Sequence, residues 1–188
     1  MPTHFGAAGG NGIGVLVGDL FLMVQQRKTS LARQIALCYL RHPGATFTEI
    51  NLFQRWIHEQ FVRLPIRVEW VRYDPYPDAE SMQIDVASTG ILKVTTQHNE
   101  FIFDPKVNLY FRAVHDYDHC RYGLDFGFDG ERQVAQVSMN RCRSLLGRQL
   151  IFSEVVAQAA VALETGRFPK QKFVPFPESL IDEVILRS

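Results

Sequence analysis

The chain has 188 residues, 46% of them hydrophobic, which is enough to build one sizeable core but not a second independent one. Its 20 Lys and Arg residues balance its 20 Asp and Glu residues, so the formal charge with neutral histidines is zero. Bulk charge therefore gives no support for a nucleic-acid partner or an anionic membrane surface, and we expect one domain over residues 1–188.

The cysteines and the apolar runs of the sequence indicate an intracellular compartment. Cys38, Cys120 and Cys142 are an odd number without Cys-x-x-Cys spacing, which is typical of reduced thiols in cytosol-like surroundings. The apolar run within residues 14–24 is interrupted by a Gly-Asp pair and follows no basic segment, so it fits neither a membrane span nor a signal peptide. We expect a cytoplasmic protein without a membrane partner, and the composition predicts no oligomeric state.

The N-terminal segment is rich in glycine. Residues 6–14 superficially resemble a nucleotide-binding loop, but no strand is predicted before them and no lysine follows, as a P-loop would require. Because ordering glycines costs conformational entropy, we expect residues 1–14 to form a flexible arm.

Two helices are predicted next, each with apolar residues at helical spacing. The first begins at Thr29 or Ser30, stops at a His-Pro-Gly sequence, and carries Leu31, Ile35, Leu37, Cys38 and Leu40. The second begins at Thr46 or Thr48, ends before Pro65, and carries Phe47, Ile50, Phe53, Ile57, Phe61 and Leu64. We expect these helices to pack together as a hairpin.

From residue 66 the hydrophobic period changes to two, as expected of strands with one buried face. Alternating segments at residues 66–72, 82–87 and 91–94 are separated by turn-forming sequences. We therefore expect a three-stranded antiparallel meander with one face on the helices.

The remainder is predicted to be helical. Asp104 and Pro105 form a helix start, with an N-cap followed by proline at the first helical position. Further helices are expected over residues 131–146, from Gly147 or Ser153 to about residue 165, and over residues 178–186. The predicted fold class is α+β, with an N-terminal helical hairpin, the small meander and a C-terminal helical bundle that carries the site.

The residues that point to chemistry follow Asp104. His115 and His119 are four residues apart, so both imidazoles lie on one helix face and can reach one metal ion. Glu131, at the start of the next helix, and Glu154, inside an apolar run, place carboxylates where a core helix would carry apolar residues. The sequence predicts a metal site on the two histidines, with either glutamate as a further ligand.

The sequence His-Asp-Tyr-Asp-His at residues 115–119, followed by Gly-Glu at residues 130–131, resembles the His-Glu-x-x-His helix of gluzincin-type metallopeptidases, which are zincin-like metallohydrolases. The resemblance implies His115, His119 and Glu131 as ligands and Asp116 as the general base. Aspartate here is one methylene shorter than the family's glutamate, and the gap to the downstream glutamate is shorter than usual. The wider pattern is also similar to uncharacterised phage and bacterial proteins, a likeness that implies no activity.

Metal-dependent hydrolysis is the leading hypothesis. A divalent ion, with zinc favoured over iron or manganese, would lower the pKa of a bound water towards 7, and Asp116 would handle the proton. Arg112, one turn before His115, would bind an anionic or carbonyl oxygen of the substrate. We expect a small molecule or a peptide as substrate, which the sequence does not identify.

Other interpretations stay open. An HD-type phosphohydrolase would use His115 and Asp116 as its doublet, His98 as an upstream ligand, and Asp129 or Asp182 as the last one. Two histidines and one carboxylate also match an iron site. A non-enzymatic, phage-type interaction or structural protein would instead hold a buried polar network or a closed four-ligand metal site, whereas a cavity at the site would favour an enzyme.

Overall fold

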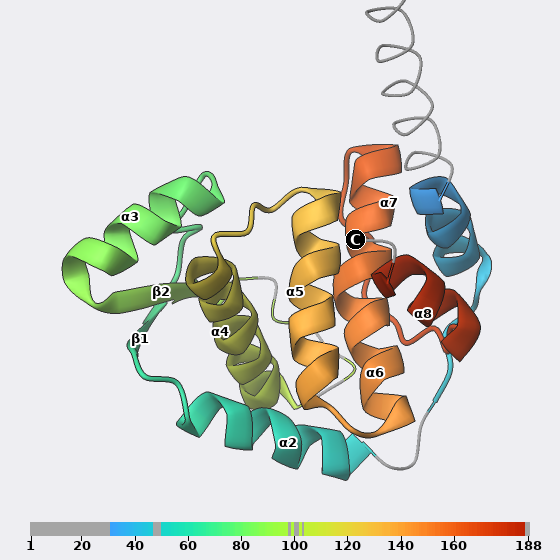
Figure 1. The fold of residues 1–188 in the computed structure, drawn as a ribbon, viewed down its shortest axis with the longest axis horizontal. Helices are drawn as coiled ribbons and strands as arrows, with labels where there is room; N and C mark the ends of the chain where they lie inside the picture. Colours follow the sequence, from blue (N-terminus) through green and yellow to red (C-terminus); the bar gives the residue numbers. More distant parts are fainter. Residues whose placement is uncertain (1–30, 47–49, 98, 100–101, 103, 187–188) are drawn as a thin grey trace, which may run out of the picture.

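The computed structural model describes residues 31–46, 50–97, 99, 102 and 104–186. The predicted arm over residues 1–14 and the predicted helix start at Thr29 or Ser30 lie outside this part. In chain order, the described elements are a helix over residues 31–41, α2 (Ile50–Val62), β1 (Arg67–Val71), α3 (Ala79–Thr89), β2 (Ile91–Thr95), α4 (Pro105–Tyr122), α5 (Phe128–Arg141), α6 (Leu145–Ile151), the π-helix η1 (Phe152–Ala157), α7 (Gln158–Thr165) and α8 (Glu178–Leu186). This part of the chain is mostly helical, with a small sheet at one side (Figure 1).

The sheet corrects the prediction of a three-stranded antiparallel meander. β1 and β2 pair in parallel, in register from Arg67 opposite Ile91 to Val71 opposite Thr95. Parallel strands cannot be joined by a tight turn, and α3 forms the crossover between them. The segment expected as the middle strand is therefore a helix.

Local signals explain this difference. Met82 and Val86 fit an alternating pattern, but they are also four residues apart and so share one face of a helix. Met82 is fully buried, whereas Ile84, which lies between them in the sequence, is 63% exposed. Asp78 caps the start of α3 through a 2.7 Å side-chain hydrogen bond, and Gly90 ends the helix in the left-handed conformation with a φ of 67°.

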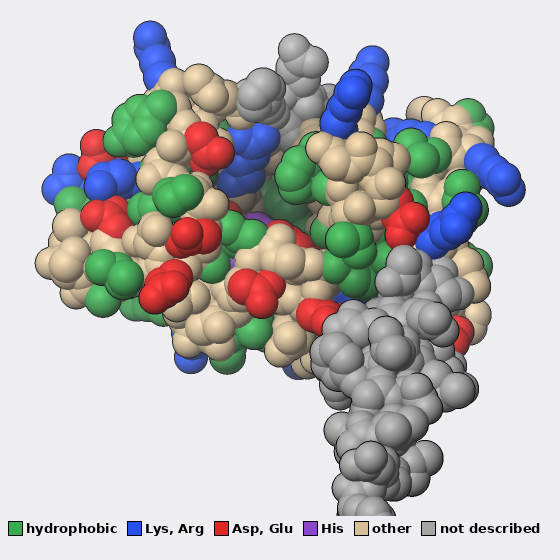
Figure 2. All heavy atoms as spheres, turned by 90° about the horizontal axis from the view of Figure 1, so that it is seen from above, with side chains coloured by type: hydrophobic (Ala, Val, Ile, Leu, Met, Phe, Trp, Pro, Cys, Tyr) green, Lys and Arg blue, Asp and Glu red, His purple; other side chains and the backbone are tan. Residues whose placement is uncertain are grey.

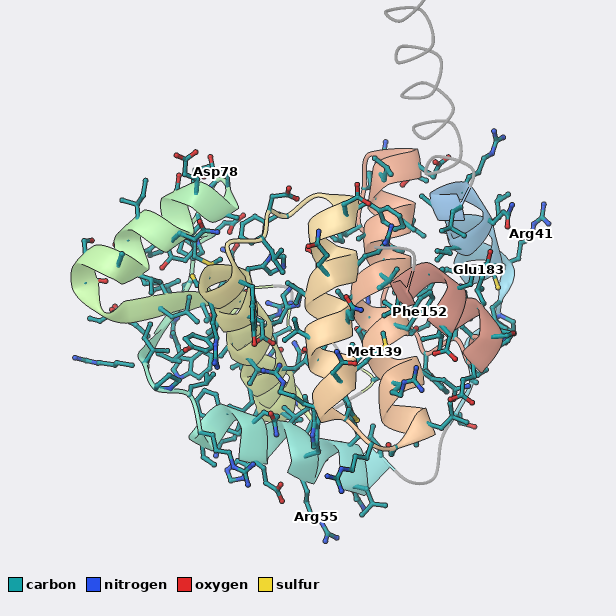
Figure 3. All side chains as sticks on the ribbon, viewed as in Figure 1. Arg41, Arg55, Asp78, Met139, Phe152 and Glu183 are labelled. Atoms are coloured by element: carbon teal, nitrogen blue, oxygen red, sulfur yellow. The ribbon has the colours of Figure 1, made fainter. Side chains whose placement is uncertain are left out.

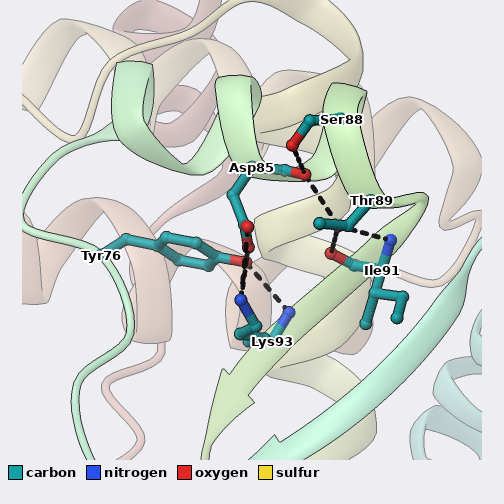
Figure 4. Close-up of polar contacts among 6 residues, drawn as sticks. All are labelled: Tyr76, Asp85, Ser88, Thr89, Ile91 and Lys93. Carbon is teal, nitrogen blue, oxygen red and sulfur yellow. Dashed lines mark hydrogen bonds and ion pairs between the residues drawn. The ribbon is translucent and has the colours of Figure 1, made fainter.

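Polar contacts hold α3 against β2 (Figure 4). The Tyr76 hydroxyl donates to Asp85 Oδ2 (3.0 Å) and accepts from the Lys93 backbone N–H (3.1 Å). Lys93 Nζ lies 2.9 Å from the same carboxylate oxygen, and its hydrogen bond is the main cause that lowers the pKa of Asp85. The network joins α3 to β2, and both of these elements contact α4, the helix that carries the histidines.

The two N-terminal helices do not pack as the predicted hairpin. The helix over residues 31–41 lies beside α8, whereas α2 runs beneath α4 (Figure 1). The buried side chains of the first helix are Ala32, Ile35, Ala36 and Tyr39, whereas Leu37 and Leu40, predicted to face the core, are 40% and 48% exposed. The C-terminal tail, and not α2, lies next to the helix over residues 31–41. The Tyr39 hydroxyl on this helix accepts a 3.1 Å hydrogen bond from the Lys172 N–H in the tail.

The C-terminal part confirms the predicted helices, with shifted boundaries. The Asp104 side chain caps α4 by accepting from the Lys106 N–H (2.8 Å), at the predicted helix start. α5 begins at Phe128, before the expected residue 131, and α8 covers the predicted residues 178–186. α6, η1 and α7 follow one another as one rod over Leu145–Thr165.

This rod is the centre of the core. All residues of η1 are buried, and the Phe152 ring lies 4.9 Å from that of Phe176. Figure 3 shows Phe152 and Met139 between α5, the rod and α8, whereas Arg55 and Asp78 lie at the periphery. By length and composition the rod could also cross a membrane, but 72% of its apolar window is buried inside the protein, as a core helix would be.

Candidate metal centre

Two helices carry the predicted site. His115 and His119 lie one turn apart on α4, and Glu131 lies in the first turn of α5. Gly123 ends α4 in the left-handed conformation with a φ of 64°, and its N–H bonds to the His119 carbonyl. The chain therefore turns back directly after the histidines and brings the start of α5 opposite them.

The three side chains converge on one point. The two Nε2 atoms of His115 and His119 are 3.1 Å apart, and Glu131 Oε2 lies 3.3 Å from the first and 3.6 Å from the second. Two ligands at about 2.0 to 2.1 Å from a tetrahedral metal ion are themselves about 3.3 Å apart. The group could therefore hold a metal ion, which confirms the predicted His-x-x-x-His pairing with a downstream carboxylate.

A backbone carbonyl orients the second histidine. His119 Nδ1 lies 3.2 Å from the Leu124 carbonyl oxygen, in the turn between α4 and α5. A carbonyl only accepts hydrogen bonds, so Nδ1 must carry the proton and donate it, which leaves the Nε2 lone pair facing the other two ligands. This arrangement is the one that metal-bound histidines usually show.

Burial and charge also suit a metal ion. The His119 side chain is fully buried, while the side chains of His115 and Glu131 are 19% and 14% exposed. Burial lowers the pKa of His115 to about 4, so its imidazole is neutral at physiological pH and can act as a ligand. Burial opposes the charged form of His119, but its contacts with Glu131, Asp116 and the Leu124 carbonyl together raise its pKa. The negative charge that favours a proton on Nε2 would equally favour a metal ion in its place.

Two of the three ligand side chains, those of His115 and Glu131, are partly exposed. Figure 2 looks down on the molecule of Figure 1 from above and shows histidine side chains at the bottom of a hollow, with acidic and basic side chains around it. The partial exposure of His115 and Glu131 agrees with access from this side. The side chain of His119, the third ligand, is fully buried beneath them.

The two residues predicted to be catalytic lie on the same helix. Asp116 is partly buried, and burial is the main cause that raises its pKa to about 7. Arg112 Nη1 donates to the carbonyl oxygens of Thr95 (3.3 Å) and Gln97 (2.6 Å), so its guanidinium ties α4 to the end of β2. A role for Arg112 in binding substrate stays a prediction, and the structure shows a packing role for it.

Glu154 is separate from the converging group. The ligand atoms that lie within 4.8 Å of one another belong to His115, His119 and Glu131, and Glu154 is not among them. It lies in η1, where Gln158 Nε2 donates to its Oε2 (2.8 Å) and its buried Oε1 has no hydrogen-bond partner within the described part of the chain. Burial is the main cause that raises its pKa to about 8. Of the two predicted carboxylates, the geometry thus joins Glu131 to the histidines.

The residues needed for an HD-type site do not gather at the histidines. His98 lies outside the described residues. Asp182 on α8 pairs with Arg148 on α6 (2.6 Å), and Asp129 pairs with Arg132 on its own helix (3.3 Å). Neither aspartate belongs to the converging group found among the described residues.

Gly130 is a site residue whose role the sequence analysis did not identify. A Cβ atom at this position would overlap the backbone carbonyl of Asp125, which lies in the turn between α4 and α5. Only glycine lets this turn lie close enough to α5 to place Glu131 over the histidines. The Gly-Glu pair noted in the sequence is the signal that could have suggested this role.

We expect Gly130→Ala to destabilise the protein and to weaken metal binding. Overpacking against backbone costs about 1 to 3 kcal/mol, which outweighs the roughly 1 kcal/mol that alanine gains over glycine within a helix. Denaturant titration and zinc titration of the variant would measure the two effects. Asn140→Ala, at an exposed position of the same helix, is the control and should change neither. A Gly130→Ala protein with wild-type stability and zinc affinity would contradict this role.

Comparisons with known proteins supply no family. No protein-family model, no curated protein and no solved structure matches the chain. The group of two histidines and one glutamate is therefore the feature that indicates what this protein does.

Proposed function

We propose that this protein is a metal-dependent hydrolase whose ion is held by His115, His119 and Glu131. The observation that carries the proposal is the convergence of the three ligand atoms, separated by 3.1 to 3.6 Å, on two different helices. The tautomer imposed on His119 by the Leu124 carbonyl adds support, because a preset Nε2 lone pair has a clear use in binding a cation.

Zinc is the ion that we favour. An octahedral ion with ligands at about 2.1 Å would need neighbouring ligand atoms about 3.0 Å apart, and two of the three separations are longer than this. Nitrogen and carboxylate ligands in tetrahedral arrangement are typical of zinc. Iron and manganese remain alternatives, because two histidines and a carboxylate also bind iron(II).

A set of three protein ligands, two of them partly exposed, favours chemistry over a purely structural ion. Structural zinc sites are usually closed by four protein ligands, whereas catalytic sites keep one position for water or substrate. A divalent ion here would act as a Lewis acid towards a bound water or a substrate oxygen. Asp116, next to His115 in the sequence, is the proposed proton acceptor, and Arg112 is proposed to bind an anionic oxygen of a small-molecule or peptide substrate.

A non-enzymatic role is the second candidate, because the His119 side chain is fully buried in the core, as expected of a structural ion. The two candidates differ in whether the bound ion keeps an exchangeable position. A cytoplasmic location, without a nucleic-acid or membrane partner, is part of the proposal and is supported by composition alone.

Metal analysis of the purified protein tests the proposal. We expect one equivalent of a divalent ion, or uptake of one equivalent of Zn²⁺ by the chelator-treated protein. Screens of peptidase, phosphodiesterase and amidase substrates with zinc, manganese and iron(II) would then define the reaction. Absence of metal together with failure to take it up would remove the mechanism, and metal uptake with uniform inactivity would favour the structural role.

We expect Asp116→Asn to keep the metal and lose turnover. Asparagine has nearly the same shape but cannot accept a proton, and general-base assistance is worth roughly 10²- to 10⁴-fold in rate. The measurement is kcat on a substrate from the screen, with metal content determined in parallel. Asp182→Asn, on α8 and remote from the histidines, is the matched control and should keep full activity. Full turnover by Asp116→Asn would exclude it as the base.

A further inference from the structure

A buried ion pair joins the two helices that carry the metal ligands. Asp118 on α4 is fully buried and accepts from Arg141, the last residue of α5, through both guanidinium nitrogens, one of them at 2.9 Å from Oδ1. Ser138 also donates to Asp118 Oδ2 (3.3 Å) and accepts from Arg141 (3.2 Å). Charge-assisted bidentate contacts of this kind fix both the distance and the orientation of their partners.

This ion pair and the metal ligands act on the same turn of α4. Asp118 lies within the turn of α4 that is bounded by His115 and His119. On α5 the corresponding contacts, Glu131 and Ser138, are two turns and roughly 10 Å apart. One turn of α4 is therefore held by α5 at two separate points.

Holding a helix at two points restricts its rotation about its own axis. The turn of α4 needs a defined rotation, since both Nε2 atoms must face Glu131 Oε2 at 3.3 and 3.6 Å. The ligands alone cannot impose it before an ion is bound, because at that stage only one carboxylate oxygen faces the two rings. A contact that is present without the ion can impose the rotation in advance.

We propose that the Asp118–Arg141 pair, with Ser138, is the positioning contact of the metal centre. Building on the proposed function, it sets the rotation of α4 and the placement of α5 so that His115, His119 and Glu131 are preorganised for the ion. Asp118 and Arg141 are positioning residues and touch neither metal nor substrate.

Zinc affinity and the cobalt spectrum of Asp118→Asn test this role. Supporting contacts around metal ligands are typically worth 10- to 100-fold in affinity, so we expect the Kd for Zn²⁺ to rise by about that factor. The visible absorption of bound Co²⁺, which reports coordination geometry, should also change. The matched control is Asp182→Asn, which removes the carboxylate paired with Arg148 between α6 and α8 (2.6 Å) and should leave Kd and spectrum unchanged.

A second variant covers the case in which Asp118→Asn does not fold. Arg141→Gln removes the cation from a side chain that is 32% exposed and leaves Asp118 its bond from Ser138. Like Asp118→Asn, it is expected to raise the Kd for Zn²⁺. Loss of stability with unchanged Zn²⁺ affinity and Co²⁺ spectrum in the folded variant would overturn the inference, because the pair would then be structural only. Failure of the wild-type protein to bind Zn²⁺ would instead overturn the proposed function.

Discussion

Replacing any one of His115, His119 and Glu131 is expected to abolish stoichiometric metal binding. The free energy of a protein zinc site can exceed about 10 kcal/mol, and it depends on every ligand because few are available. Three ligand atoms converge among the described residues. If one is lost, the two that remain bind the ion too weakly to compete with its hydration by water. The variants are His115→Ala, His119→Ala and Glu131→Gln, measured by metal content after dialysis and by Zn²⁺ titration.

Matched controls separate the site from histidines and carboxylates in general. His58→Ala removes an exposed imidazole on α2, and Glu164→Gln neutralises an exposed carboxylate on α7. Both variants should bind metal as the wild-type protein does. Full occupancy in Glu131→Gln would contradict the three-ligand group. Retention of metal by His119→Ala together with its loss in both His115→Ala and His98→Ala would favour the HD-type arrangement.

The part of the site that the sequence predicts is the part that depends on local spacing. His115 and His119 are placed by one turn of helix, and Glu131 by a short turn and a helix start, so few other contacts intervene. The Leu124 carbonyl and the close approach at Gly130 depend on the path of the turn in space. The pattern of residue types along the chain does not specify that path.

Errors in the predicted fold have the same origin. Residues 82–86 satisfy the strand and helix periods together, and the cap at Asp78 and the crossover between parallel strands favour the helix. In the first helix, Leu37 and Leu40 are more hydrophobic than Ala32 and Ala36, yet the alanines are buried and the leucines are exposed. The small alanine side chains let this face of the helix pack closely against the core. The ion pair between Asp118 and Arg141 joins residues 23 apart and has no local signal.

A second large effect is expected from Glu154→Gln, on stability. Burial raises the pKa of Glu154 from its ordinary 4.5 to about 8, because the ionised form would lose hydration and, among the described residues, has a hydrogen bond from Gln158 alone. The nearby Arg112 favours the ionised form but does not offset burial. Glu154 is therefore protonated in the folded protein at neutral pH.

The sign of the pH dependence follows from the two protonation states. Between about pH 4.5 and pH 8 the unfolded chain has lost the Glu154 proton and the folded chain still holds it, so unfolding releases a proton. Stability therefore falls as the pH rises through this window. Outside it, the contribution of Glu154 to the free energy of unfolding does not change with pH. Across the whole window, Glu154 lowers the free energy of unfolding by on the order of 3 to 5 kcal/mol.

Glutamine cannot ionise, and its carbonyl oxygen can still accept the hydrogen bond from Gln158. We therefore expect Glu154→Gln to be more stable than the wild-type protein at about pH 8, by on the order of 3 to 5 kcal/mol, and to lose this advantage at about pH 5. Denaturant unfolding of both proteins across this range measures the difference, and subtraction removes the contribution of all other groups. Glu164→Gln, at an exposed site on α7, should show no such trend. Parallel stability curves for the wild-type and Glu154→Gln proteins would mean that Glu154 is ionised in the folded state, and would reopen its candidacy as a metal ligand.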